Sequence, residues 1–108
     1  MLIRQDTPVA WPTGLDLRRR IAVHARSERA LSFRVGLTSD VDARADLYHR
    51  QAPDFAELVV LGQTTSETQM RETERDLQQW YREDFDSPHF GVVGADGPPP
   101  YFLYVALR

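Results

Sequence analysis

The chain has no cysteine, which excludes disulfide bonds and thiolate metal sites. Its stability must therefore come from packing, and any metal ion would have to be bound by oxygen atoms or histidine. The chain also has no lysine: all 13 basic residues are arginine, a bias that we attribute to genome composition. Arginine nonetheless retains a planar guanidinium that suits phosphate groups.

Long apolar runs are absent too. No stretch approaches the roughly 20 apolar residues that span a bilayer, and residues 1–14 (MLIRQDTPVAWPTG) lack the apolar core of a signal peptide. These absences predict a cytoplasmic protein that does not bind a membrane.

The 108 residues suffice for one domain with one core. With 42% hydrophobic and 27% charged residues, the composition is typical of a soluble globular protein. The net charge of −3 is unevenly distributed, because residues 1–34 carry +4 and residues 35–108 carry −7. The basic part includes Arg18, Arg19 and Arg20. Such a cluster on a helix is either a solvated face or a patch that follows a phosphate backbone.

Periodicity and turn signals predict a compact α/β fold in which three strands are covered by helices. We expect a single domain, with residues 1–30 as an irregular lead-in and a basic helix, and residues 31–108 as the core. The expected elements are a helix from about residue 16 to residue 28, strands at 30–38, 55–63 and 101–107, helices at 40–51 and 65–84, and a loop at 85–100.

Two of the expected helices begin with capping residues. Ser39 or Asp40 can accept backbone N–H groups at the start of the second helix, and Pro53 ends that helix near residue 51. Ser66 and Gln69 have the spacing of a capping box at the start of the third helix.

Two charged residues lie beside the apolar stripes of these helices. Glu74 is four residues after Met70 and three before Leu77, and Arg44 is four residues before Tyr48. An unpaired carboxylate on an apolar stripe is costly, so Glu74 needs a cationic or metal partner, a proton, or a place at the edge of a cleft. Two interpretations stay open: a buried Arg44–Glu74 salt bridge, or a functional site that the two residues share.

Residues 33–49 (FRVGLTSDVDARADLYH) resemble the YIG half of the GIY-YIG endonuclease superfamily. The family has a strand that contains a glycine, and the helix that follows carries an arginine eight residues after that glycine. Here the glycine is Gly36 and the arginine is Arg44. Four residues later the family places a tyrosine or histidine, matched by Tyr48, with His49 adjacent. In a later helix, a glutamate three residues before a leucine binds the metal, matched by Glu74.

The resemblance extends over residues 31 to 83, with Arg34 at the position of the YIG tyrosine. The family's first strand, which holds the GIY motif, has no counterpart before it. Residues 91–105 (GVVGADGPPPYFLYV) resemble a circularly rearranged branch in which this strand follows a Gly-rich loop near the C-terminus. On that mapping Tyr104, or else Tyr101, replaces the GIY tyrosine. The implied fold is GIY-YIG nuclease-like, a small three-stranded sheet flanked by helices, with an extra N-terminal helix.

The implied activity is metal-dependent hydrolysis of phosphodiester bonds in nucleic acid. Glu74 would bind one Mg²⁺ or Mn²⁺ ion, and Arg44 would hold the phosphoryl oxygens. Tyr48 or Tyr104 would position or deprotonate the attacking water, with His49 as a further base.

The nucleic acid, DNA in preference to RNA, would be bound by basic residues. They are Arg34, Arg18, Arg19 and Arg20.

Two other functions stay open. A non-catalytic module of the same fold would bind nucleic acid or protein through its basic first helix and its aromatic end strand. Arg34 favours it, because arginine stays protonated and so cannot accept a proton as a general base. Alternatively, the chain is a domain that forms a homodimer through residues 101–108 (YFLYVALR) and binds neither metal nor nucleic acid.

Overall fold

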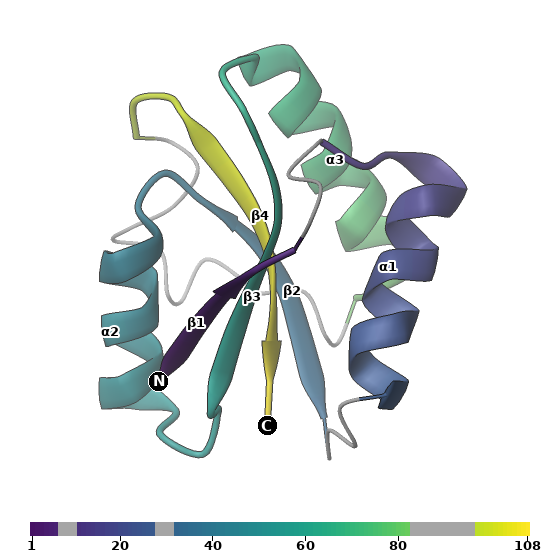
Figure 1. Cartoon of the computed structure of the whole chain (residues 1–108). Coiled ribbons are helices and arrows are strands. Elements are labelled where there is room, and N and C mark those ends of the chain that lie inside the picture. Colours follow the sequence, from purple (N-terminus) through teal and green to yellow (C-terminus); the bar gives the residue numbers. More distant parts are fainter. Residues whose placement is uncertain (7–10, 28–31, 83–96) are drawn as a thin grey trace.

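The chain forms a mixed four-stranded sheet with α2 on one face and α1 and α3 on the other (Figure 1). This computed structural model describes residues 1–6, 11–27, 32–82 and 97–108. The elements in chain order are β1 (Leu2–Gln5), α1 (Gly14–Ser27), β2 (Phe33–Thr38), α2 (Val41–Gln51), β3 (Glu57–Thr64), α3 (Glu67–Trp80) and β4 (Tyr101–Leu107).

The strands lie in the order β1-β3-β4-β2. β1 runs parallel to β3, whereas β4 is antiparallel to both of its neighbours, β3 and β2. The prediction of a three-stranded sheet is therefore wrong. Leu2–Gln5, which we expected in an irregular lead-in, forms a fourth strand. So short a segment forms a strand because β3 supplies a parallel partner along its whole length.

The expected helices and the other strands are confirmed, with small shifts at their ends. The carboxylate Oδ1 of Asp40 accepts from the Ala43 N–H at 3.0 Å, and so Asp40, not Ser39, caps α2. The Ser66 hydroxyl accepts from the Gln69 N–H at 3.1 Å at the start of α3. Most of the loop expected at 85–100 lies outside the described residues.

The sheet has an apolar core on each face, because successive side chains of a strand point in opposite directions. On one face Val59 of β3 packs with Leu17 of α1 and Leu77 of α3. On the other face Leu58 of β3 packs with Leu47 of α2. α2 and α3 therefore lie on opposite faces of the sheet, as Figure 1 shows.

β4 is one of the two inner strands, and its side chains are all buried except that of Phe102, which is half-buried. Both of its edges are paired, one with β2 and the other with β3. Dimerisation through residues 101–108 therefore cannot occur by strand addition at β4, because both edges of this strand are already paired. Among the described ranges, no helix has the length and apolar character that a membrane span requires.

Candidate functional site

Three of the predicted catalytic residues meet on the α2 face of the sheet. Nη1 of Arg44 donates to the hydroxyl of Tyr104 at 2.9 Å, and the hydroxyls of Tyr48 and Tyr104 lie 3.3 Å apart. The two tyrosine rings meet edge to face with their centroids 6.1 Å apart. We call Arg44, Tyr48 and Tyr104 the Arg–Tyr–Tyr cluster.

Local structure explains why these side chains meet. Arg44 and Tyr48 are one helical turn apart on α2, so both point at the sheet. Tyr104 lies on β4 opposite Gly36 of β2, in the middle of the face that α2 covers. Of the two tyrosines that could replace the GIY tyrosine, Tyr104 is the one that lies beside Arg44. Tyr101 belongs to the core on the opposite face of the sheet.

The Arg–Tyr–Tyr cluster is inaccessible to solvent. Arg44 is 3% exposed, and Tyr48 and Tyr104 are both 0% exposed. A phosphate ester or an attacking water must reach a catalytic group to react. In this conformation the cluster is a hydrogen-bonded part of the core.

Glu74 does not join the cluster. It lies on α3, whose Met70 and Leu77 pack on the opposite face of the sheet from Arg44. Its Oε1 lies 3.3 Å from Nη1 of Arg71, and its side chain is 29% exposed. Both sequence-based interpretations of Arg44 and Glu74, a shared site and a buried salt bridge, are therefore contradicted.

The surroundings of Glu74 do not fit the divalent ion that the resemblance implies. The guanidinium of Arg71 occupies the neighbourhood of the Glu74 carboxylate and would repel a metal ion there. A site for Mg²⁺ or Mn²⁺ takes several oxygen ligands. Within the described ranges, no group of three or more histidine, aspartate or glutamate side chains is arranged to supply them.

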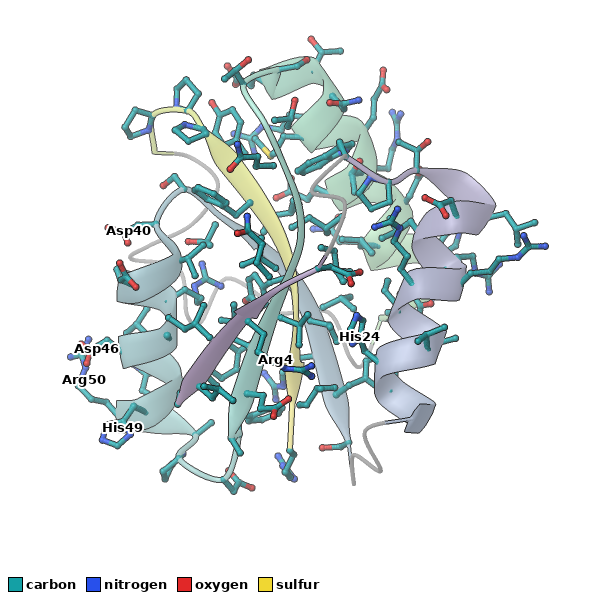
Figure 2. The ribbon with its side chains drawn as sticks, viewed as in Figure 1. Arg4, His24, Asp40, Asp46, His49 and Arg50 are labelled. Carbon is teal, nitrogen blue, oxygen red and sulfur yellow. The ribbon has the colours of Figure 1, made fainter. Side chains whose placement is uncertain are left out.

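Two further predicted residues are held away from the Arg–Tyr–Tyr cluster. His49 is exposed, and Figure 2 shows it with Asp46 and Arg50 on the side of α2 that faces away from the sheet. It is therefore not a base beside Tyr48. The Arg34 guanidinium lies 5.8 Å from the ring centroid of Phe55, so its aromatic contact is with the core beneath α2.

The run of three arginines on α1 points in different directions. Arg18 and Arg19 are exposed, and the guanidinium of Arg18 lies 5.2 Å from the ring centroid of Trp80 on α3. Arg20 instead forms ion pairs with Asp6 at 3.6 Å and Asp16 at 3.2 Å. Two of the three predicted phosphate-binding arginines on this helix are thus presented to solvent.

The contact between the end of β1 and α1 was not predicted from the sequence. Oδ2 of Asp6 lies 3.4 Å from Nε2 of His24 and also pairs with Arg20. The ion pair with Arg20 and the contact with His24 hold Asp6, which directly follows β1, against α1. The sequence does place an acidic residue, Asp6, directly after Leu2–Gln5. Asp6 indicates a contact with the basic helix only once Leu2–Gln5 is recognised as a strand.

Large exposed apolar side chains gather at the start of the chain. In the described part of the protein these are Leu2, Ile3, Leu15 and Val23, which are 39% to 63% exposed. Two belong to β1 and two to α1. Neither the Arg–Tyr–Tyr cluster nor Glu74 lies among them, so this exposed surface is separate from the predicted catalytic residues.

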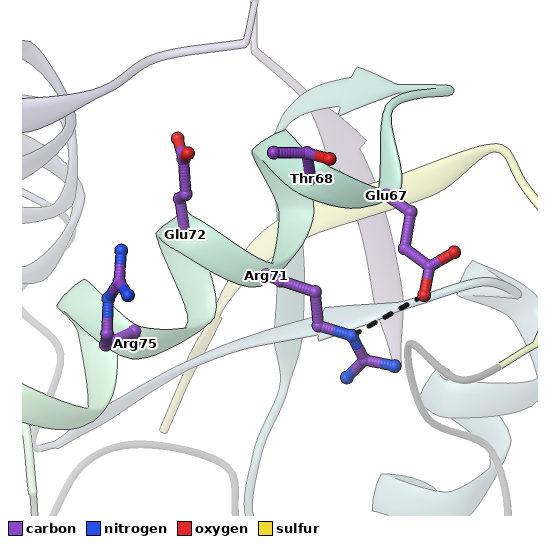
Figure 3. Close-up of a pocket in the computed structure, with 5 residues that line it drawn as sticks. All are labelled: Glu67, Thr68, Arg71, Glu72 and Arg75. Carbon is purple, nitrogen blue, oxygen red and sulfur yellow. Dashed lines mark ion pairs between the residues drawn. The ribbon is translucent and has the colours of Figure 1, made fainter.

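A surface depression of about 400 Å³ lies along α3 (Figure 3). It is lined by Glu67, Thr68, Arg71, Glu72 and Arg75. All five come from a single helix, and Arg71 pairs with Glu67 across it at 3.9 Å. Ligand sites are usually lined mostly by apolar side chains, whereas the five residues that line this depression are all polar or charged.

Comparison with protein-family models, curated proteins and solved structures finds no match to this chain. The resemblance to the GIY-YIG superfamily therefore stays a prediction from the residues alone.

Proposed function

We propose that the chain is a non-catalytic protein-binding module that accepts an extended strand at the outer edge of β1. The sequence left open a non-catalytic binding module, but one that binds through its basic first helix and its aromatic end strand; the surface proposed here is a different one. The observation that carries the proposal is that β1 is paired on one side only in the described residues, while Leu2 and Ile3 on it are 56% and 39% exposed.

The backbone of β1 supports this proposal. The N–H groups of Leu2 and Asp6 donate to the carbonyls of Ala56 and Val60 at 2.9 and 2.8 Å. Because the direction of the backbone polar groups alternates along a strand, those of Ile3 and Gln5 point to the outer edge. A strand edge of this kind is a template for another strand.

The side chains of β1 support it as well. Leu2 lies on the same face as Arg4, and Ile3 lies on the face that α2 covers, where it pairs in register with Leu58. Both apolar side chains remain partly exposed, so a partner strand would cover them further as it pairs. Charged side chains commonly protect an edge strand from pairing with other chains. The single charged residue of β1 is Arg4, whose guanidinium forms an ion pair with Glu57 at 2.8 Å.

The test uses the full chain and a display library of random linear peptides. We expect enriched peptides of alternating apolar character that protect the Ile3 and Gln5 amides from hydrogen exchange. Binding should be lost in Ile3→Pro, which removes an outward N–H but no bond to β3. It should persist in Leu15→Lys, a control change at an exposed apolar residue of α1. Peptides that bind Ile3→Pro as well as the wild type would contradict the proposal.

Nuclease activity is tested in the same preparation. The protein is incubated with supercoiled, linear and branched DNA in Mg²⁺ or Mn²⁺, beside Glu74→Gln, a surface change that preserves the core. We expect no cleavage, because the Arg–Tyr–Tyr cluster is buried and Glu74 lies across the sheet. Cleavage by the wild type that disappears in Glu74→Gln would support the predicted endonuclease instead.

Nucleic-acid binding through α1 is the second candidate, and the exposure of Arg18 and Arg19 favours it. Binding of this kind would weaken steeply with salt, because each phosphate contact releases counterions. Fluorescence anisotropy with labelled DNA checks it. A salt-dependent affinity that is lost in the double variant Arg18→Glu/Arg19→Glu and kept in Ile3→Pro would favour this candidate over the β1 edge.

A further inference from the structure

We infer that the strand received by β1 is β1 of a second copy of this chain, in antiparallel register with Ile3 opposite Ile3 of the copy. The inference rests on the proposed function, since it names the partner of the same edge. It joins the two four-stranded sheets into one continuous sheet about a two-fold axis.

Hydrogen-bond geometry limits the registers that a symmetric pair can adopt. A two-fold axis perpendicular to the sheet places one residue opposite itself. If that residue directs its N–H and C=O outward, the two copies exchange both bonds. Ile3 and Gln5 meet this condition, because the N–H groups of Leu2 and Asp6 are bonded to β3. A pair centred on Ile3 also brings the Gln5 N–H to the Met1 carbonyl of the copy.

Charge selects among the registers. Centring on Arg4 would place two guanidinium groups directly opposite each other, which destabilises a cross-strand pair. Centring on Gln5 would place neither Leu2 nor Ile3 opposite a residue of Leu2–Gln5 of the copy. Centring on Ile3 places it against its own copy and places Leu2 across the aliphatic stem of Arg4, whose charged end is already paired with Glu57.

The position of the helices is compatible with this centre. Asp6 binds Arg20 and His24, so α1 approaches the C-terminal end of β1. The exposed residues Leu2 and Ile3 lie at the other end, where the pair would form. Because the axis is perpendicular to the sheet, α1 and α3 of both copies lie on one side of the joined sheet and both α2 helices lie on the other.

The mass of the wild-type chain is measured by light scattering and sedimentation over a wide range of concentrations. We expect a dimer whose dissociation constant rises on the order of 30-fold or more in Ile3→Lys, the change typical of a hot-spot residue. Ile3→Lys places two like charges at the axis and keeps every backbone N–H. The control Leu15→Lys should leave the dissociation constant unchanged, and thermal unfolding should show that both variants fold.

The register is tested separately, and the absence of cysteine removes any background. In Ile3→Cys the two thiols face each other across the axis, where antiparallel Cα atoms lie about 5.5 Å apart. A short bifunctional bimane, which fluoresces only after it bridges two thiols, should link them rapidly. The control Leu15→Cys should not react in this way.

Three outcomes decide the inference. A monomer at every concentration overturns the second copy as partner, and the proposed function survives if peptides still bind at β1. A dimer that Ile3→Lys leaves intact overturns the inference, because a different surface then joins the copies. If neither a dimer nor a peptide engages β1, the proposed function fails together with the inference.

Discussion

The guanidinium of Arg44 donates to the hydroxyl of Tyr104 at 2.9 Å, across 60 residues of sequence. This bond joins α2 to the inner strand β4 in a place that solvent does not reach. A buried guanidinium needs hydrogen-bond acceptors because its transfer from water is costly. The pair is therefore a stabilising contact of the core on the α2 face, and its contribution to the free energy of unfolding can be measured.

Removal of the Tyr104 hydroxyl should destabilise the protein. In Tyr104→Phe the buried guanidinium loses one acceptor, at a cost of about 1–3 kcal/mol. In the double variant with Arg44→Met the loss should be smaller than the sum of the two single losses, with a coupling energy of about 0.5–3 kcal/mol. Urea unfolding measures all three values. Tyr81→Phe, at a half-buried tyrosine that packs edge-on against Phe33, is the control for the loss of a hydroxyl.

Neutralisation of Glu74 should have little effect on stability. Its ion pair with Arg71 is partly exposed, so Glu74→Gln should change the free energy of unfolding by about 0.5 kcal/mol or less. Millimolar Mg²⁺ or Mn²⁺ should shift the melting temperature of wild type and Glu74→Gln equally, since a ligand stabilises only a protein that binds it. A metal-induced rise that the variant lacks would show that Glu74 does bind the ion.

Helix caps should contribute more to the free energy of unfolding than surface ion pairs do. Asp40→Ala and Ser66→Ala each remove a side-chain acceptor for a backbone N–H, and each should destabilise the protein by about 1 kcal/mol. Asp40→Asn keeps the acceptor and should retain most of the stability. If Asp40→Asn and Asp40→Ala proved equally unstable, the negative charge and not the hydrogen bond would be the source of the effect.

Hydrogen exchange should separate the strands. Amides of the inner strands β3 and β4 should exchange most slowly, because both are paired on two sides and most of their side chains are buried. Amides of β1 that bond to β3 should exchange faster, because β1 has four residues and a single partner strand. Equal protection of β1 and the inner strands would contradict this order.

The sequence was informative where a local pattern decides the structure. The apolar run at 101–107 predicted β4, and the cap spacing at Ser66 predicted the start of α3. β1 was missed because four residues carry too little periodicity to be recognised, and its conformation depends on the register with β3. Interactions distant in sequence decide such a segment.

The site could be predicted only in part, for a related reason. Helical spacing correctly placed Glu74 near the side of α3 that carries Met70 and Leu77. The spacing of apolar residues in a helix predicts which side of the helix packs against the sheet. It does not predict on which of the two faces of the sheet the helix lies. α2 and α3 pack on opposite faces, so Arg44 and Glu74, each beside the apolar stripe of its own helix, are separated by the sheet.

The place of β4 in the sheet also constrains how the domain can be synthesised. β2 and β3 are not neighbours, and each is hydrogen-bonded to the seven-residue strand that follows every other element in the chain. A ribosome releases these seven residues after all the rest of the fold. Until they emerge, β1 and β3 can pair with each other, but β2 lacks the strand with which it pairs in the described part of the chain, and both apolar cores lack the side chains of β4.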